Sequence, residues 1–223
     1  MEIPRADTLT PPPGTSLIET LRVDGDGAVP LLDGHLARLA RSAAALGYAC
    51  DTAAIRHAIG ERARALPRGS AHRMRLLLDG AGHPSLETAV LPPLSALPGV
   101  ALASERLDAA QLLLRHKTTH RPWYAQATAW LAAHGDCFDL LYANSRGELC
   151  EGSRSNVYLL RDGRWLTPPV ESGLLPGVQR AALLAAGSAE IATLTLDDLA
   201  GAAGIRLSNA LRGWFDVRRV DTA

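Results

Sequence analysis

The stretch Arg115-His116-Lys117-Thr118-Thr119 contains Lys117, the only lysine among the 223 residues of this chain. The chain holds 23 Lys and Arg residues, and all the others are arginines. Arginine replaces lysine readily on a surface, but a guanidinium stays protonated in proteins and does not act as a neutral amine. A sole lysine is therefore a candidate for attack on a carbonyl to form a Schiff base. The alternative is that Lys117 is a surface lysine without a function, kept by chance while other lysines were replaced by arginine.

The composition is that of a globular protein, with 47% hydrophobic and 21% charged residues. Lys and Arg together equal Asp and Glu in number, so no basic surplus indicates a nucleic-acid partner. No apolar run approaches the roughly 20 residues that a membrane span needs, and the N-terminus lacks the apolar stretch of a secretory signal. The three cysteines show no C-x-x-C pairing, and the histidines are scattered. We therefore expect a cytoplasmic protein without membrane, nucleic acid, disulfide or metal site.

Hairpin and helix signals follow one another along the chain, which favours an α+β fold over a doubly wound parallel sheet. The Pro-rich stretch 92–99 resembles a linker, and we expect two domains, residues 1–95 and 96–223. Turn signals predict hairpins at Asp24–Gly27 and Asp79–Gly82. Asp33 and Asp51 are expected to cap two helices, and Gly47 is expected to end the first of them. Apolar and β-branched runs predict strands at 16–23, 72–78, 86–91, 100–104, 138–143, 157–160, 164–167, 190–196, 205–208 and 215–219; helices are predicted at 33–46, 51–66, 122–133 and from 177.

Four further features are candidates for chemistry, each with a simpler explanation. The polar stretch Glu151-Gly152-Ser153-Arg154-Ser155-Asn156 offers a carboxylate, or is a solvated loop. Gly173–Arg180 enters a helix through a glycine-bearing turn whose free N–H groups favour an anion, although many helices start this way without a ligand. Arg38 has polar neighbours one turn away on its helix, or is an ordinary exposed arginine. The polar segment Ser208–Leu211, which follows a predicted strand, either faces a pocket or only turns the chain.

Taken in order, five segments resemble the fold-type IV pyridoxal-phosphate (PLP) enzymes, the class-IV aminotransferase family. The resemblance covers about Ser16 to Arg219 and implies the two-domain D-amino-acid aminotransferase-like architecture. The segments that carry it are Leu17-Ile18-Glu19-Thr20-Leu21-Arg22, His35-Leu36-Ala37-Arg38-Leu39, Arg115-His116-Lys117-Thr118-Thr119, Glu151-Gly152-Ser153-Arg154-Ser155-Asn156-Val157 and Gly173-Leu174-Leu175-Pro176-Gly177.

The resemblance implies a PLP site. Lys117 would bind the cofactor as a Schiff base and then act as acid and base. Glu151 would keep the pyridine nitrogen protonated. Arg38 would bind the phosphate, to which Val178 and Gln179 would add backbone N–H groups at a helix start.

Further roles are implied around this site. Ser155, Asn209 and Ala210 are candidates around the ring and the phosphate. Thr20 and Arg22 share one strand face, where Thr20 would contact the reacting atoms and Arg22 a substrate carboxylate. Family members are usually homodimers that act on small molecules.

Within the family, Lys117-Thr118-Thr119 and Asn209-Ala210-Leu211 are most similar to the aminodeoxychorismate lyases, which release pyruvate and 4-aminobenzoate for folate synthesis. A transaminase acting on branched-chain or other amino acids is the alternative. A non-catalytic scaffold that keeps the fold for dimerisation or cofactor storage is a third hypothesis. The chain departs from the family before the Glu-Thr strand, where Pro13-Gly14-Thr15-Ser16 replaces a Gly-Asp-Gly element. Asp79-Gly80, in place of an Arg and a His, argues against D-amino-acid specificity.

Overall fold

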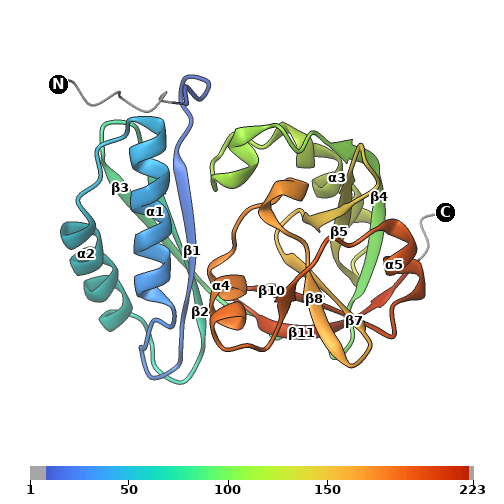
Figure 1. Cartoon of the computed structure of the whole chain (residues 1–223). Coiled ribbons are helices and arrows are strands. Elements are labelled where there is room, and N and C mark those ends of the chain that lie inside the picture. Colours follow the sequence, from blue (N-terminus) through green and yellow to red (C-terminus); the bar gives the residue numbers. More distant parts are fainter. Residues whose placement is uncertain (1–8, 221–223) are drawn as a thin grey trace. The chain divides into compact units, whose positions relative to one another are not determined.

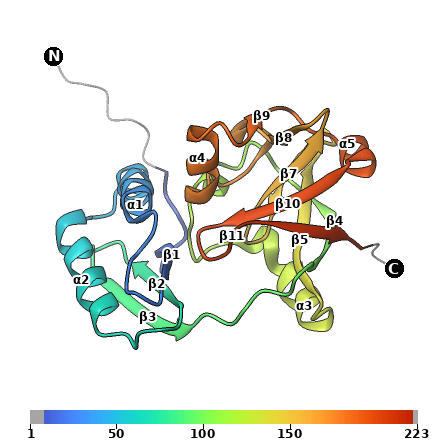
Figure 2. The ribbon, with the colours of Figure 1, turned by 90° about the horizontal axis from the view of Figure 1, so that it is seen from below.

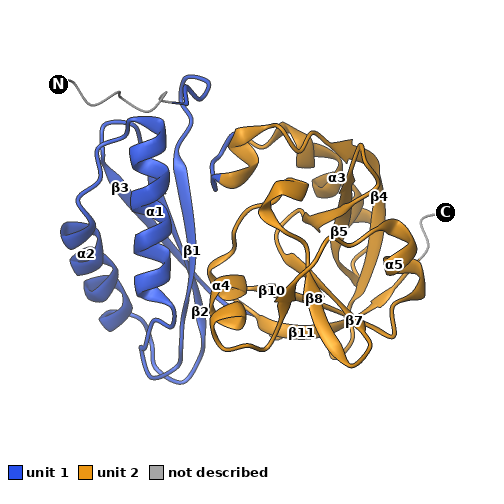
Figure 3. Ribbon diagram, viewed as in Figure 1, with its two compact units in different colours: residues 1–92, 116–120 blue, residues 93–115, 121–223 orange. Residues whose placement is uncertain are grey.

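The computed structural model describes residues 9–220 and divides the chain into two compact units (Figure 3). One unit holds the residues up to Pro92 together with His116–His120, and the other holds Pro93–Arg115 and the residues from Arg121 onward. The segment with Lys117 therefore groups with the N-terminal unit, although Pro93–Arg115 precedes it in the sequence. The division into domains at residues 95 and 96 stays a prediction.

The N-terminal unit is an antiparallel sheet in the order β1–β2–β3, with α1 and α2 on one face (Figure 2). Alternate side chains of β1 and β2 are buried, which is the pattern of strands that cover a core on one face. Leu21, Met74 and Leu78 are completely buried there. The elements are β1 (Leu17–Val23), α1 (Leu32–Leu46), α2 (Thr52–Arg64), β2 (His72–Leu78) and β3 (Pro84–Val90).

Local signals in this unit gave several correct predictions. Gly47 ends α1 in the left-handed conformation, at φ 70°, which glycine adopts without steric cost. The Asp51 side chain accepts the N–H groups of Ala53 and Ala54 and so caps α2. The hairpin around Asp79–Gly82 joins β2 and β3.

Two predictions in this unit are wrong. Asp24–Gly27 turns the chain, with the Asp24 N–H donating to Ala28 O, but no hairpin follows. The chain continues into α1, and β1 pairs with the distant β2 instead, because turn chemistry reverses a chain without choosing its strand partner. Asp33 does not cap α1; Leu31 holds the N-cap position without a side-chain bond, and Asp33 lies in the first turn, paired with Arg56 at 2.5 Å.

The second unit is built on a mixed sheet in the order β6–β5–β4–β11–β10–β7–β8–β9. The strands β4, β5, β7, β8, β10 and β11 are labelled in Figure 1. All eight residues of β5 are buried, and β5 pairs in parallel with β4 and antiparallel with β6. Side chains of β5 contribute to two hydrophobic clusters, one including Leu141 and the other including Leu140 and Tyr142. The strands are β4 (Gly99–Leu107), β5 (Cys137–Asn144), β6 (Leu149–Gly152), β7 (Asn156–Arg161), β8 (Arg164–Thr167), β9 (Glu190–Ile191), β10 (Gly204–Asn209) and β11 (Gly213–Arg219).

Helical segments connect these strands. They are the 3₁₀ helices η1 (Leu112–Arg115), η2 (Pro122–Tyr124) and η3 (Val170–Ser172), and the α-helices α3 (Ala125–Ala133), α4 (Val178–Ala185) and α5 (Leu196–Gly201). The strand predicted at 190–196 is mostly wrong: only Glu190–Ile191 is a strand, and Leu196 begins α5. A capping box formed by Thr195 and Asp198 starts α5, and this signal outweighs the short apolar run.

The combination of an antiparallel sheet and a mixed sheet with interspersed helices confirms the predicted α+β class. Among residues 9–220, no helix is both long and apolar enough to cross a bilayer. Within the same range, no group of three or more His, Cys, Asp or Glu side chains is arranged to hold a metal ion.

Candidate active site

Lys117 lies on a short segment that docks along β1 by its backbone. The N–H of Ile18 donates to Lys117 O at 2.7 Å, and Thr119 N–H donates to Ser16 O at 2.9 Å. Leu17 and Thr118 form an isolated antiparallel bridge, and Thr118 is completely buried. The half-buried Lys117 side chain therefore starts from a backbone position that is fixed relative to the strand carrying Thr20.

The same segment is attached to α1. His116 Nδ1 lies 3.0 Å from the Ser42 hydroxyl, and Ser42 is buried on α1. The polar side of α1 that the sequence indicated is thus buried within this unit.

Arg38 lies on this face and is buried against Glu19 of β1. Its Nε and Nη2 donate to the two carboxylate oxygens at 2.9 and 2.5 Å, a side-on pair in which Nη1 takes no part. His35 Nδ1 lies 2.6 Å from Glu19 Oε2. Burial alone would raise the pKa of Glu19, but the charge of Arg38 and hydrogen bonds from His35 and Arg38 lower that pKa to about 2. Arg38 is therefore a fixed, buried cation and not an ordinary exposed arginine.

Thr20 and Arg22 share one face of β1, as their spacing predicts. In the sheet register Thr20 lies opposite Arg75, and Arg22 lies opposite Arg73. Arg22 Nε also donates to Asp24 at 2.5 Å, so this guanidinium has an acidic neighbour. Arg73 and Arg75 were not singled out from the sequence, although the alternation within His72–Leu78 places both on the face that carries Thr20.

Glu151 lies on β6 in the second unit and is 3% exposed. Its Oε1 accepts the Tyr124 hydroxyl at 2.6 Å and the Leu175 N–H at 3.0 Å, and Asn156 Nδ2 lies 3.4 Å from Oε2. Burial and the nearby negative charge of Glu151 raise the pKa of Tyr124 well above its ordinary value. Tyr124 is consequently a protonated donor to the carboxylate, a contact that sequence reasoning missed.

The turn after Glu151 is held by hydrogen bonds to the carboxylate of Asp139, which is completely buried on β5. Asp139 Oδ1 accepts the N–H and the hydroxyl of Ser153, and Oδ2 accepts the Arg154 N–H and the Ser155 hydroxyl at 2.6 Å. Burial raises the pKa of Asp139 although these hydrogen bonds oppose it. The Ser155 hydroxyl is thus used for the architecture of the turn, and its role toward a cofactor stays a prediction. A Cβ at Gly152 would lie 2.3 Å from Asp139 Oδ2, so this packing requires glycine.

The start of α4 is open to an anion. Gly177 is its N-cap and no side chain caps the helix, so the N–H groups of Val178 and Gln179 lack an intrahelical acceptor. A Cβ at Gly177 would lie 2.0 Å from Asn156 Oδ1. Asn156 donates to Leu175 O at 2.9 Å and so connects the approach to α4 with Glu151.

Asn209 ends β10, and its side chain forms hydrogen bonds with neighbouring backbone groups. Oδ1 accepts the N–H groups of Leu211 and Arg212, and Nδ2 donates to Arg154 O at 3.2 Å. Asn209 therefore lies beside the turn that contains Ser155, with the half-buried Ala210 next in the chain. Direct contact of Asn209 or Ala210 with a cofactor stays a prediction.

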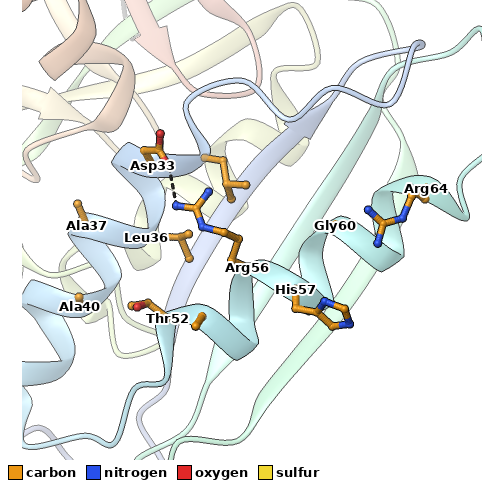
Figure 4. A pocket seen from close by; sticks show the side chains of 11 residues that line it. Asp33, Leu36, Ala37, Ala40, Thr52, Arg56, His57, Gly60 and Arg64 are labelled. Atoms are coloured by element: carbon orange, nitrogen blue, oxygen red, sulfur yellow. Dashed lines mark hydrogen bonds and ion pairs between the residues drawn. The ribbon is translucent and has the colours of Figure 1, made fainter.

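A groove of about 740 Å³ lies between α1 and α2 in the N-terminal unit (Figure 4). Arg56 reaches across it from α2 to Asp33 on α1. None of the predicted site residues lines this groove. We assign it no part in the candidate site.

The donor set matches the groups of PLP. The chain offers one amine at Lys117, a buried carboxylate at Glu151 for a ring nitrogen, a buried guanidinium at Arg38 and an uncapped helix start at Val178 for a phosphate. Lys117, Arg38, Thr20 and Arg22 belong to the N-terminal unit, whereas Glu151, Ser155, Val178, Gln179, Asn209 and Ala210 belong to the second.

The family model for amino-transferase class IV matches residues 16–220, and the chain belongs to this family. Members of this family are PLP-dependent enzymes of the aminotransferase or lyase type, and solved structures with the same fold confirm the fold-type IV architecture.

Individual relatives point to both reaction types. The chain is 28% identical over 204 residues to the "putative aminodeoxychorismate lyase" of Schizosaccharomyces pombe. The aligned region covers 89% of this chain and 87% of that protein. It is 38% identical to the solved structure of a "putative amino-acid aminotransferase" from Mesorhizobium loti, with a TM-score of 0.84 over 92% of this chain and 100% of that one. A "probable branched-chain-amino-acid aminotransferase" of Thermotoga maritima is 44% identical over only 45 residues, which is 20% of this chain and 16% of that protein. Other matching structures include 4-amino-4-deoxychorismate lyases.

Proposed function

We propose that this chain is a PLP-dependent 4-amino-4-deoxychorismate lyase that releases pyruvate and 4-aminobenzoate. The observation that carries the proposal is the similarity to the S. pombe protein, which extends over nearly the whole length of both chains. The face that Thr20 shares with Arg22, Arg73 and Arg75 supports it, because the substrate carries two carboxylates and guanidinium is suited to bind them. The proposal places the enzyme in the cytoplasm and makes it a homodimer.

In this proposal, some residues of the site bind the cofactor, and Lys117 also moves a proton. Lys117 binds the cofactor covalently and then, as a free amine, takes the proton from the carbon that bears the substrate amine. Bound PLP supplies an electron sink for the negative charge that this proton transfer leaves. Glu151 holds the ring nitrogen, while Arg38 and the N–H groups of Val178 and Gln179 hold the phosphate.

Other residues act on the substrate. Thr20 holds the reacting atoms by a hydrogen bond, and Arg22 binds a carboxylate. Ser155, Asn209 and Ala210 shape the surroundings of the ring and phosphate. The C–O bond to the enolpyruvyl group breaks, the departing enolpyruvate is protonated on carbon to give pyruvate, and the ring that remains is aromatic, which makes the reaction favourable without a keto-acid acceptor.

A transaminase acting on branched-chain or other amino acids is the second candidate. The 38% identity with the Mesorhizobium loti structure favours it. The two functions share the lysine and the cofactor, and they differ in what happens after proton removal.

The test is a pyruvate assay on protein reconstituted with PLP. Pyruvate and 4-aminobenzoate formed from 4-amino-4-deoxychorismate in equal amounts, without added keto acid, is the expected result. Conversion of the bound cofactor to its amine form by an amino acid, without pyruvate release, would replace the lyase by the transaminase. A protein that takes up no PLP would overturn both and favour a non-catalytic scaffold.

A further inference from the structure

Tyr124 follows Lys117 by seven residues in the sequence, and its hydroxyl donates a 2.6 Å hydrogen bond to Glu151 Oε1. Tyr124 is 6% exposed, and its ring is held on two sides. The guanidinium carbon of Arg121 lies 4.5 Å from the ring centroid, and the Tyr142 ring lies 5.1 Å away at an interplanar angle of 76°. The direction of the hydroxyl is therefore fixed by packing.

Two donors converge on Oε1 of Glu151. Oε1 receives the hydroxyl of Tyr124 and the N–H of Leu175, whereas the contact of Oε2 with Asn156 Nδ2 is 3.4 Å long. Two good donors on one oxygen fix the rotation of the carboxylate. They also favour its ionised form, because hydrogen bonds to a charged group stabilise the charge.

The segment that contains Tyr124 supports the turn after Glu151 at a second point. Arg121 Nη2 donates to Ser153 O at 2.6 Å, so Arg121 and Tyr124 contact the backbone and the side chain of one short stretch. Both residues stand only a few positions after Lys117.

Satisfying a buried hydroxyl does not by itself account for this contact. Tyr142 packs against Tyr124 and is completely buried; its hydroxyl makes no side-chain hydrogen bond among residues 9–220 and has the backbone of Ala127 beside it. A buried phenol of this pair is therefore accommodated without a carboxylate as its hydrogen-bond partner, whereas Tyr124 donates to Glu151.

We propose that Tyr124 is a positioning residue for Glu151, holding that carboxylate ionised and oriented toward a protonated pyridine nitrogen. This inference rests on the proposed role of Glu151 toward PLP. Without the hydroxyl, the proton shared by Glu151 and the ring nitrogen moves toward the carboxylate. The ring then carries less positive charge, and the nitrogen of Lys117 holds its own proton more tightly in the loaded enzyme.

The experiment compares Tyr124→Phe with Tyr142→Phe, each removing one buried hydroxyl from the same aromatic pair. The readouts are the pH profile of the cofactor's visible absorption and the dissociation constant of PLP. We expect the absorption transition of Tyr124→Phe to move up by about 0.5–1 pH unit, which is a three- to tenfold change in a proton equilibrium, and PLP to bind up to about tenfold more weakly. Tyr142→Phe should match the wild type in both.

Glu151→Gln shows whether Tyr124 acts through Glu151. Adding Tyr124→Phe to Glu151→Gln should change the pH profile little, because the interaction is already removed. Site-specific 3-fluorotyrosine at position 124 covers the case of a poorly folded phenylalanine variant: it keeps the ring and strengthens the donor, so the transition should move down.

The outcomes separate this inference from the proposed function. A wild type that binds PLP, together with a Tyr124→Phe profile identical to that of the wild type, overturns the role of Tyr124 and leaves the function standing. Equal shifts in Tyr124→Phe and Tyr142→Phe overturn it as well, because a general loosening of the pair would then suffice. A wild type that gives no visible band with PLP overturns both proposals.

Discussion

Glu19→Gln removes the negative charge from the buried ion pair that Glu19 forms with Arg38 in the N-terminal unit. The side chains of Glu19 and Arg38 are 3% and 8% exposed, and the variant keeps the size of residue 19. The Arg38 guanidinium would then lie buried beside a neutral amide. Because its partner charge is removed while its own burial remains, we expect a large loss of stability.

The magnitude follows from the pKa of Glu19. A decrease from 4.5 to about 2 corresponds to about 3 kcal/mol of stability from ionised Glu19. Breaking a buried pair by removing one partner costs roughly 3–5 kcal/mol, which is consistent with this value. The folded pKa lies below the unfolded one, so this contribution is complete above pH 4.5 and is lost as the pH falls toward about 2.

Urea unfolding of the apo protein at pH 7 and at pH 3 measures both effects. All four tryptophans lie in the second unit, so far-UV circular dichroism is needed to follow the N-terminal unit. Glu19→Gln should lower the unfolding free energy at pH 7 by about 3 kcal/mol, and the difference from the wild type should shrink at pH 3. Glu87→Gln, an exposed carboxylate on β3, is the control and should change neither value by more than about 0.5 kcal/mol. A loss below about 1 kcal/mol at pH 7, or an equal loss at both pH values, would refute the reasoning.

Three further changes test other parts of the structure. Asp139→Asn replaces one of the two acceptor oxygens by an NH₂ group that donates. It should lower the unfolding free energy by about 1–3 kcal/mol in urea titrations. An unchanged midpoint would contradict the role of Asp139 in holding the turn after Glu151. Gly177→Ala places a Cβ 2.0 Å from Asn156 Oδ1, and should weaken PLP binding in a fluorescence titration by about tenfold; unaltered affinity would show that the approach to α4 is less constrained than described. Arg75→Met should raise KM for 4-amino-4-deoxychorismate by about 10-fold or more with unchanged PLP uptake, whereas Arg62→Met on α2 should leave KM unchanged; equal effects would remove Arg75 from the substrate face.

Much of the N-terminal unit could be predicted from the sequence because its signals are local. Alternation gave β1 and β2, Asp51 gave the cap of α2, and Gly47 gave the end of α1. The pairing of β1 with β2 was out of reach, since a turn at Asp24 is compatible with either a hairpin or a helix.

In the candidate site, too, local features could be predicted from the sequence, whereas contacts between distant residues could not. Residue chemistry makes Lys117 a candidate because it is the only lysine of the chain, and its role toward PLP stays a prediction. Its attachment to β1 depends on backbone bonds to Ile18 and Ser16, residues about a hundred positions away in the chain, which no periodicity reveals. The support of Glu151 by Tyr124 is equally non-local, since 27 positions separate the two.

The central claim is that Lys117 carries the cofactor, and peptide mapping after borohydride reduction of the PLP-loaded protein tests it most directly. Because the chain has one lysine, reduction should place a single phosphopyridoxyl group on the peptide that contains Lys117, and Lys117→Arg should carry none on that peptide and lose the visible band. A visible band that survives in Lys117→Arg, or a loaded wild type whose label lies elsewhere, would contradict the account.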